Sequence, residues 1–532
     1  MGKTGPIFKL LKDRRFAVLW GMVQLSFLGM FVHIVAAAWA MTELTDSKLM
    51  VALVQTAQAL PIVLFSVVAG AFADTYDRRL ILFISLSLSL LASALLALAA
   101  QFGFLTPWLM LGLICVVGTG VAFIMPTWMS VLGEVFDRVQ LRDAISVQNI
   151  GANAMRTVGP MFGGVLVAAG GAAPAFLVGA FSYLPGVVAV LFWRRSVDTP
   201  KDRESVINAL TAGLQFLLVS PQLLTLLLRV LLFSLAGASV LSLLPLIAQN
   251  QLELGADGFG ALFGGFGFGA VLGGFSLAAF GRRMPPEKLS RFIMLANSLS
   301  IGALALSTGF WPGLIAAAVS GACWLMGHSL HNTALQLASP SWIGGRIAAT
   351  FMTAAFLGLA CGGWLWGLCA ELLGTRGALG LALVTMALTL ILAWRWPMPE
   401  TENLDFEPLQ IGPERELGVT MPTRAGPVHV SIEYRISGSR VADFERLMHA
   451  RRLHLTRLGA RHWRLLQDLG SQDIWIEQFQ VRSWGDYERL MERRTADTAS
   501  LRKRINAIQQ DRWQPRVQIL VPKLAKTSKS GR

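Results

Sequence analysis

The chain has 532 residues, of which 54% are hydrophobic and only 15% are charged, and its mean hydropathy is +0.55. Because soluble domains carry about 25% charged residues, this composition excludes an ordinary soluble globular protein and favours a chain that crosses a membrane many times. The net charge of +14 could indicate a nucleic-acid partner, but the basic residues gather in loops between apolar segments, so no nucleic-acid binding is expected.

Twelve segments are long and apolar enough to be membrane helices, which need about 20 mostly apolar residues. They lie near residues 16–41, 49–73, 80–101, 106–130, 145–169, 172–193, 222–248, 258–280, 288–310, 312–336, 346–371 and 376–396. The first is longer than the roughly 7–15 apolar residues of a signal peptide, so we expect it to be a membrane helix. The predicted fold class is an all-α polytopic membrane protein with two pseudo-symmetric bundles of six helices.

The loop charges predict the orientation of these helices. Basic residues precede the first helix and follow the second, fourth, sixth, eighth and tenth, whereas the alternate loops offer only Lys48 and Arg376. The positive-inside rule then places both termini in the cytoplasm. The predicted location is therefore the cell (inner) membrane, with multiple passes and with the lipid bilayer as a partner.

The two halves share positions at one constant offset along the chain, which indicates an internal repeat. The matched pairs are Gly70 with Gly274, Arg78 with Arg282, Arg79 with Arg283, Arg142 with Arg346, Gly159 with Gly363 and Gly163 with Gly367. Transporters are commonly built from such repeats, with the substrate path between them. We therefore expect one bundle at residues 1–195, a cytoplasmic linker with an interfacial helix at 196–221, and a second bundle at 222–396.

The chain changes character after the last apolar segment. Residues 397–427 are rich in Pro, Glu and Gly and indicate a linker, and residues 522–532 form a basic tail. Between them, residues 428–521 alternate strand and helix patterns in the order βαββαβ, which predicts a cytoplasmic ferredoxin-like α+β domain. Strands are expected near 428–434, 461–468, 473–481 and 516–521, and helices at 441–458 and 484–507. Neither its histidines nor the four cysteines of the chain show metal-site spacing, so no metal and no cofactor are expected.

The segment from Gly70 to Arg79 resembles the signature loop of the major facilitator superfamily. It keeps the glycine, the acidic residue and the two basic residues of that pattern and departs from it at Thr75 and Asp77. The resemblance implies a gating motif made of Gly70, Asp74, Asp77, Arg78 and Arg79, with Gly274, Arg282 and Arg283 as its second-half counterpart, where Ala278 replaces the acid. The alternative is an ordinary capped turn whose arginines only set the topology.

The fifth predicted helix carries a second motif, Gly159-Pro160-Met-Phe-Gly163-Gly164. It resembles the Gly-Pro-x-x-Gly element of antiporters and exporters of the same superfamily. Small residues allow helices to approach closely and proline kinks a helix. Generic helix packing is the alternative interpretation.

The resemblance extends over almost the whole chain. It is carried by Trp39 to Ser47, Pro126, Asn149, Asn153, Arg156, the Gly459-Ala460-x-x-Trp463 segment and the segment from Trp484 to Arg489. The chain is similar there to the family of enterobactin exporters and transmembrane secretion effectors, although many relatives have His where Tyr487 stands. This implies proton-coupled efflux of a siderophore-like, drug-like or other hydrophobic small molecule by alternating access. The C-terminal domain resembles dimeric α+β barrels, which would allow dimerisation through it.

Polar side chains inside membrane helices are costly and are therefore candidates for function. The candidates for the substrate cavity are Gln24, His33, Gln55, Gln58, Asn149, Asn153, Arg156, His328, His331, Asn332 and Gln336. His328, His331 and Asn332 share one helix face because they lie at i, i+3 and i+4. For proton coupling the candidates are Glu43 and Arg156, and Glu43 could equally be an interfacial carboxylate at a helix end.

A function from another class is the alternative to transport. The chain could be a membrane-anchored protein whose C-terminal domain is a small-molecule enzyme or sensor. No phosphate-binding G-x-x-x-x-G-K-[ST] motif is present, so direct use of ATP is not expected. The favoured interpretation is a secondary active transporter, not an enzyme, whose partners are a small-molecule substrate and protons.

Overall fold

The computed structural model describes residues 14–136, 138–192, 220–281, 283–339, 344–398, 421–422, 425–492, 496–509 and 515–522. The chain divides into two compact units. The helical unit comprises Met1–Lys201, Thr225–Ala334 and Ala348–Met398, and the sheet unit comprises Asp202–Leu224, Leu335–Ile347 and Pro399–Arg532. The predicted interfacial helix at 196–221 and the basic tail lie almost entirely outside the described residues.

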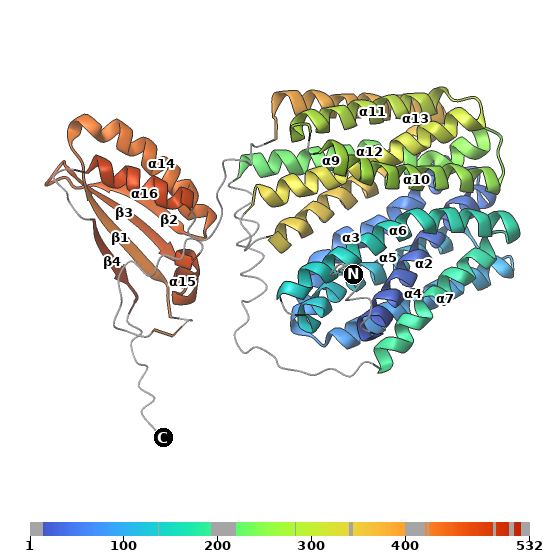
Figure 1. Cartoon of the computed structure of the whole chain (residues 1–532), viewed down its shortest axis with the longest axis horizontal. Helices are drawn as coiled ribbons and strands as arrows, with labels where there is room; N and C mark the ends of the chain where they lie inside the picture. Colours follow the sequence, from blue (N-terminus) through green and yellow to red (C-terminus); the bar gives the residue numbers. More distant parts are fainter. Residues whose placement is uncertain are drawn as a thin grey trace, which may run out of the picture. The chain divides into compact units, whose positions relative to one another are not determined.

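Six helices of the first half gather in one group (Figure 1). They are α2 (Arg14–Leu44), α3 (Lys48–Thr75), α4 (Arg78–Gln101), α5 (Pro107–Val135), α6 (Arg138–Gly170) and α7 (Ala172–Phe192). Three of these helices begin at residues that favour a helix start. Ser47 caps α3, Asp77 caps α4, and Thr106 caps α5, whose first residue is Pro107. Each apolar segment predicted in this half therefore lies on a helix.

The second half contains α9 (Pro221–Leu246), α10 (Ala256–Phe280), α11 (Pro286–Leu306), α12 (Phe310–Leu337) and α13 (Gly344–Arg395). Helix α9 continues into a π-helical turn, η1 (Ile247–Gln251). The two last predicted segments, 346–371 and 376–396, are joined in α13, which is interrupted at Gly374 with φ 77° and ψ 166°. Only glycine adopts such a positive φ without strain, so the chain can turn there between two helical stretches without an intervening loop.

Ten helices among the described residues are long and apolar enough to cross a membrane. The difference from the twelve predicted segments has two sources. Helix α13 counts as one candidate, and α6 is not among the ten. Helix α6 also begins earlier than the predicted 145, at Arg138, and its charged and amide side chains, which lie between Arg138 and Arg156, lower its hydropathy.

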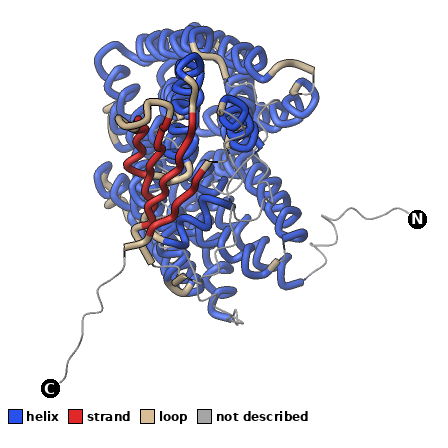
Figure 2. The backbone as a smooth tube through the Cα atoms, turned by 90° about the vertical axis from the view of Figure 1, so that its left-hand side faces the viewer, coloured by secondary structure: helices blue, strands red, loops and turns tan. Residues whose placement is uncertain are grey.

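The sheet unit is built from four antiparallel strands in the order β2-β3-β1-β4, which lie side by side in Figure 2. The strands are β1 (Val428–Arg435), β2 (Arg461–Gln467), β3 (Ile474–Val481) and β4 (Arg516–Leu520). The helices are α14 (Val441–Arg457), α15 (Trp484–Glu492) and α16 (Ala496–Ile508), with a 3-10 turn, η3 (Gly438–Arg440), before α14. The single helix expected at 484–507 is thus described as two.

A buried carboxylate organises the core of the sheet unit. Glu477 of β3 has no exposed surface. Its oxygens accept hydrogen bonds from the Tyr434 hydroxyl at 2.8 Å, from Arg451 Nε at 2.8 and 3.0 Å and from Trp463 Nε1 at 2.8 Å. A buried charge is tolerated when it is paired and hydrogen-bonded in this way, so Glu477 ties two strands beside its own and α14 to one point.

Candidate functional site

A polar cluster surrounds His328 on α12, in the second half of the helical unit. Its Nδ1 lies 2.8 Å from the carbonyl oxygen of Trp324, and its Nε2 lies 2.9 Å from Ser234 Oγ on α9. Because a carbonyl can only accept a hydrogen bond, Nδ1 carries the proton, and Nε2 of the neutral ring accepts from Ser234. The rings of Trp324 and Phe233 pack against the imidazole, with centroids 4.2 and 5.4 Å away.

The cluster reaches into the first half through Arg156. This residue lies on α6 and its charge interacts with His328 on α12. A cation on a helix of one half is therefore within electrostatic range of a histidine on a helix of the other. The structure brings together two residues that the sequence singled out separately.

His331 lies one turn further along α12 and is 1% exposed. Its Nδ1 lies 2.6 Å from the carbonyl oxygen of Gly327, whereas its Nε2 is buried without a hydrogen-bond partner among the described residues. Asn332 is half-buried beside it, but Gln336 is exposed and belongs to the segment grouped with the sheet unit. The predicted stripe on α12 is therefore split between its buried centre and its exposed end.

An ion-pair network joins helix ends of the second half near the start of α9. Arg229 is 1% exposed and pairs with Glu287 of α11 at 2.9 Å. Glu287 also accepts hydrogen bonds from Arg291 Nε at 2.9 Å and from the Met398 backbone at 2.8 Å. The pairing explains how a buried arginine is tolerated and fastens the starts of α9 and α11 to the end of α13.

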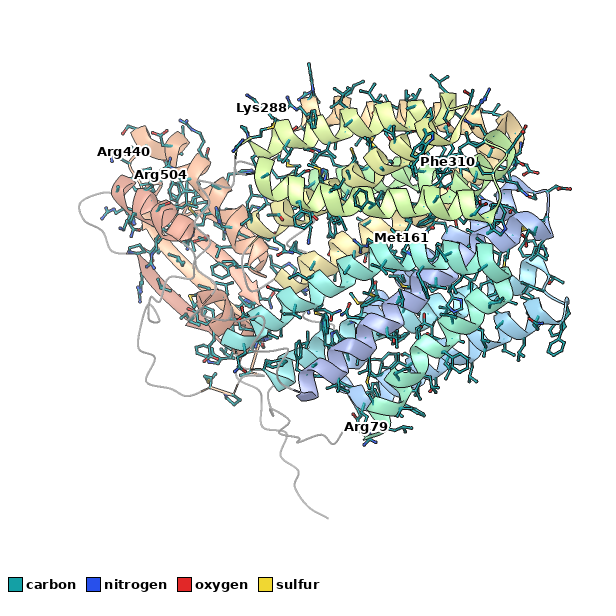
Figure 3. All side chains as sticks on the ribbon, turned by 45° about the vertical axis from the view of Figure 1, so that its right-hand side comes forward. Arg79, Met161, Lys288, Phe310, Arg440 and Arg504 are labelled. Atoms are coloured by element: carbon teal, nitrogen blue, oxygen red, sulfur yellow. The ribbon has the colours of Figure 1, made fainter. Side chains whose placement is uncertain are left out.

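The two halves touch where α6 crosses α10. A Cβ atom added to Gly164 would lie 2.2 Å from the Cα of Gly260, and one added to Gly260 would lie 2.6 Å from the Cα of Gly164. Trp39 of α2 stacks on Phe259 of α10 beside this crossing, with ring centroids 5.6 Å apart. Figure 3 labels Met161, which lies on α6 at the same contact between the halves. Only backbone fits between the helices at this crossing.

A second contact between the two halves joins α3 to α13. Thr56 Oγ1 donates a hydrogen bond to the Ala360 carbonyl at 2.8 Å, and Cβ atoms added to Gly363 or Gly367 would collide with Thr56 or Ala52. Near the start of α3, Glu371 Oε2 accepts from the Leu49 backbone at 3.1 Å and from the Ser47 hydroxyl at 3.4 Å. A carboxylate at a helix N-terminus satisfies free backbone N–H groups and complements the helix dipole. All these contacts lie towards the end where α2 turns into α3, which we call the α2–α3 end.

The Gly-Pro-x-x-Gly element serves two interfaces at once. Cβ atoms added to Gly159 or Gly163 would collide with Phe31 or Val32 of α2, in the same half. The next residue, Gly164, meets the other half, and Pro160 is buried between them. The element therefore does pack helices closely, and one of its glycines forms the contact between the halves.

The signature loop lies at the opposite end of the first half. Asp77 accepts a hydrogen bond from the Arg79 backbone at 2.9 Å and caps α4. Arg78 is buried and donates to the carbonyl oxygens of Ala73 at 3.0 Å and of Ser130 at 2.9 Å. Arg79, labelled in Figure 3, donates to the carbonyl oxygen of Val190 at 2.8 Å and to that of Leu191. Both arginines thus satisfy carbonyl groups at helix ends of their own half.

Other residues of the gating motif are less informative in this conformation. A Cβ added to Gly70 would meet nothing within 4 Å, so no close helix approach is found there among the described atoms. At Gly274 the nearest atom is Leu325 Cδ2 at 3.3 Å, and Arg283 is exposed. The Asp74 side chain and Arg282 lie outside the described parts, as do the side chains of Asn149 and Asn153.

The remaining candidates of the first half lie in separate places. Gln24 Nε2 donates to Gln148 Oε1 at 3.0 Å, which links α2 to α6. His33 is buried between Phe176 and Tyr183 of α7, with both ring nitrogens unpartnered among the described residues. Gln55 and Gln58 are buried on α3. Glu43 is exposed in the last turn of α2 and accepts a hydrogen bond from Trp39 Nε1 at 2.7 Å, as an interfacial carboxylate would.

Sequence reasoning missed Ser234 and Glu371. Serine is frequent in membrane helices, so nothing marked Ser234 as the partner of a histidine on another helix. Glu371 was detectable, because a carboxylate at the end of a long apolar segment is unusual. Its partner is a backbone N–H group, which carries no signal in the sequence.

Comparison with known proteins places this arrangement in a wider context. A family profile described as transmembrane secretion effector matches residues 6–527. The enterobactin exporter EntS of Shigella boydii is 26% identical over 384 residues, which are 71% of this chain and 86% of that protein. The Staphyloferrin A transporter of Staphylococcus aureus is 29% identical over 171 residues, 31% of this chain and 42% of the relative. An uncharacterized MFS-type transporter of Bacillus subtilis, YfiS, is 28% identical over 226 residues, 41% of this chain and about half (52%) of its own length.

Solved structures agree on the fold. A bacterial homolog of the human lysosomal transporter Spinster, in an inward-facing and unoccupied conformation, superposes with a TM-score of 0.56 at 17% identity, covering 74% of this chain and 96% of that chain. The nucleoside transporter NupG gives a TM-score of 0.58 at 14% identity, covering 72% and 98%. At such identities the likeness shows the fold alone, a helical polytopic transporter fold.

Proposed function

The chain belongs to the transmembrane secretion effector family of major facilitator superfamily transporters, and from this premise we propose that it exports a siderophore-like, drug-like or other hydrophobic small molecule in exchange for protons. Family membership establishes a multi-pass membrane transporter and not an enzyme. The direction of transport, the coupling ion and the substrate class are the proposal.

The observation that carries the proposal is the interaction between Arg156 and His328 across the two halves. Alternating access requires a central site whose walls belong to both halves. A half-buried cation there favours a substrate with a carboxylate, phenolate or other anionic oxygen. Siderophore names among the relatives, enterobactin and Staphyloferrin A, point to the same class of oxygen-rich molecules.

We place both termini in the cytoplasm and count twelve spans, with α6 as the fifth and with α13 contributing two, on either side of Gly374. The α2–α3 end then faces outwards. The contacts between the halves at Gly164 and at Glu371 close that end, so we assign the conformation to an inward-facing state. The six-helix bundles are proposed at residues 1–195 and 222–396, linked by residues 196–221.

For the coupling proton, His328 is better supported than Glu43 as the group that takes up the proton, and Arg156, which keeps its charge in proteins, would act on it through that charge. A histidine can change charge near neutral pH, and a neighbouring substrate anion or arginine would bias that change. Glu43 is exposed and is held by Trp39, away from the central cluster. The gating role proposed for Asp74 to Arg79 rests on the family pattern and on the intra-half bonds of Arg78 and Arg79.

The sheet unit is proposed to be a cytoplasmic ferredoxin-like domain, bounded by residues 428 and 521 and joined through the linker at 397–427. Its strand order β2-β3-β1-β4 and antiparallel pairing support this. An accessory role in stability or dimerisation fits the family better than catalysis.

The test is uptake of catecholate, hydroxycarboxylate and hydrophobic drug candidates into everted membrane vesicles, with and without an imposed proton gradient. We expect uptake of at least one class, abolished by a protonophore. R156Q should reduce that uptake by about 30-fold, because a hydrogen bond to a charged group contributes about 2 kcal/mol. R156K should retain part of it.

The control is R395Q, which removes an exposed arginine at the end of α13 and should transport normally. Uptake that ignores the proton gradient would refute the coupling, and an R156Q protein as active as R395Q would refute the central role of Arg156.

A further inference from the structure

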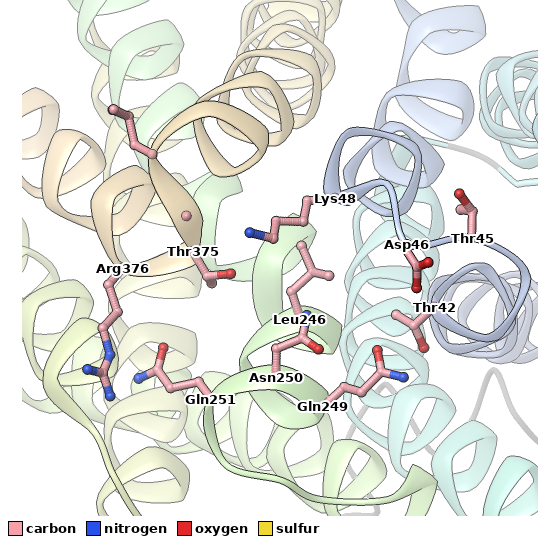
Figure 4. Close-up of a pocket in the computed structure, with 12 residues that line it drawn as sticks. Thr42, Thr45, Asp46, Lys48, Leu246, Gln249, Asn250, Gln251, Thr375 and Arg376 are labelled. Carbon is pink, nitrogen blue, oxygen red and sulfur yellow. The ribbon is translucent and has the colours of Figure 1, made fainter.

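A polar cavity of about 680 Å³ opens at the α2–α3 end of the helical unit. Its walls come from both halves (Figure 4). The turn between α2 and α3 contributes Asp46 and Lys48, the π-helical turn contributes Gln249 and Asn250, and the interruption of α13 contributes Thr375 and Arg376. The residues that line the cavity are different from those of the cluster around His328.

Local backbone features create this cavity. The π-helical turn η1 widens the end of α9 and carries both amides of Gln249 and Asn250 on one short segment. The positive φ of Gly374 turns the chain directly before Thr375 and Arg376. Glu371 joins the α13 side to the start of α3 through Leu49. Three irregular segments that are distant in the sequence therefore meet around one space.

Basic residues are rare in the loops at this end of the protein, and two of them line the cavity. Lys48 and Arg376 are the two basic residues that the alternate loops contain, and the structure places both at the same cavity. Neither forms an ion pair within the described part of the chain. Figure 4 shows the Lys48 ammonium extending into the space between the α3 and α13 walls, and Arg376 lying beside Gln251. Glu371 accepts hydrogen bonds from the start of α3 and does not line the cavity. Asp46 is the acidic residue among those that line it.

We propose that this cavity binds a small, oxygen-rich anion that carries several carboxylates, with one carboxylate on Lys48 and another on Arg376. Arginine and lysine are suited to this because guanidinium forms paired hydrogen bonds with a carboxylate and ammonium acts as a point charge. The amides of Gln249 and Asn250 and the Thr375 hydroxyl supply hydrogen bonds for further oxygens.

Occupancy has a conformational consequence. Lys48 belongs to one half and Arg376 to the other, so a ligand that bridges them interacts with the joined arrangement of this end and loses one partner when the halves separate. A ligand can shift a conformational equilibrium only by such differential binding. The bound anion therefore stabilises the state in which the α2–α3 end is closed, and under the proposed orientation it acts from outside the cell.

The test is isothermal titration calorimetry of the purified full-length protein in lipid nanodiscs, with citrate as the probe at low ionic strength. Because the ion pairs are partly solvated, we expect a dissociation constant on the order of 1 mM. K48Q and R376Q should each weaken binding about fivefold, and raising the salt concentration should weaken it further. Trimethyl citrate, the uncharged ester, should give no saturable heat.

The matched controls are K288Q and R395Q, which remove exposed basic residues outside the cavity. They should bind citrate within twofold of the unmodified protein. Absence of saturable binding at 20-fold the expected dissociation constant, about 20 mM, would overturn the proposal, as would equal losses in the controls and in K48Q and R376Q. Because no transport is measured, such a failure is independent of the exporter hypothesis.

Discussion

Replacing Gly164 by alanine should open the α2–α3 end of the transporter. The added methyl group would lie 2.2 Å from Gly260 Cα and 3.1 Å from Gly260 C. Ordinary carbon contacts need about 3.5–4 Å, so α6 and α10 must separate by more than 1 Å, and no flexible side chain can yield. Such overpacking costs about 1–3 kcal/mol, and about 2 kcal/mol corresponds to a roughly thirtyfold shift against the closed arrangement.

Hydrogen–deuterium exchange in nanodiscs measures this shift. In G164A, peptides covering the end of α6 and the start of α10 should exchange faster than in the unmodified protein. The matched control is G112A on α5, where an added Cβ meets nothing within 4 Å and exchange should not change. G260A should reproduce the effect from the opposite side. If G164A exchanged like G112A, the glycine crossing would not determine closure and the reasoning would be wrong.

Further predictions concern stability. R229A should lower the free energy of unfolding by about 1–3 kcal/mol, because it removes the buried charged partner of Glu287, which keeps only Arg291 and the Met398 backbone, whereas R291A, with a third of its side chain exposed, should cost less than about 1 kcal/mol in the same melting assay. E477A should make the sheet unit much more sensitive to limited proteolysis in the full chain, while the exposed-site variant E445A should not. Burial raises the pKa of the Tyr434 phenol above its usual value of about 10. The unfolded chain therefore loses this proton first, stability falls as pH rises above about 10, and Y434F should flatten that fall in an alkaline melting series.

The positions of the helices and strands were largely predictable. Apolar length located the described helices of the helical unit to within a few residues, apart from the early start of α6. In the sheet unit, the alternation through Val428, Val430 and Ile432 predicted β1 closely. Hydrophobic periodicity is a local property, so the sequence contains it directly. The break between residues 371 and 376 was predicted, but the sequence did not show that the chain turns there at Gly374 alone, without an intervening loop.

The candidate site was predictable in kind but not in arrangement. Arg156 and His328 were identified as polar groups in apolar helices, yet their proximity depends on how α6 and α12 pack. His33 was identified by the same argument and lies elsewhere, against aromatic rings of α7. Glu43 illustrates the same limit, since its exposure depends on the depth at which α2 ends.

The sequence by itself determined the membrane class and the family, and it predicted a repeat of the two halves, because hydropathy, charge and residue spacing are present along the chain. The tertiary structure alone decided which surfaces meet. Gly164 opposes Gly260, Glu371 caps a helix of the other half, and Lys48 and Arg376 share a cavity. Such contacts join residues far apart in the chain through backbone atoms and shape, and neither leaves a pattern in a single sequence.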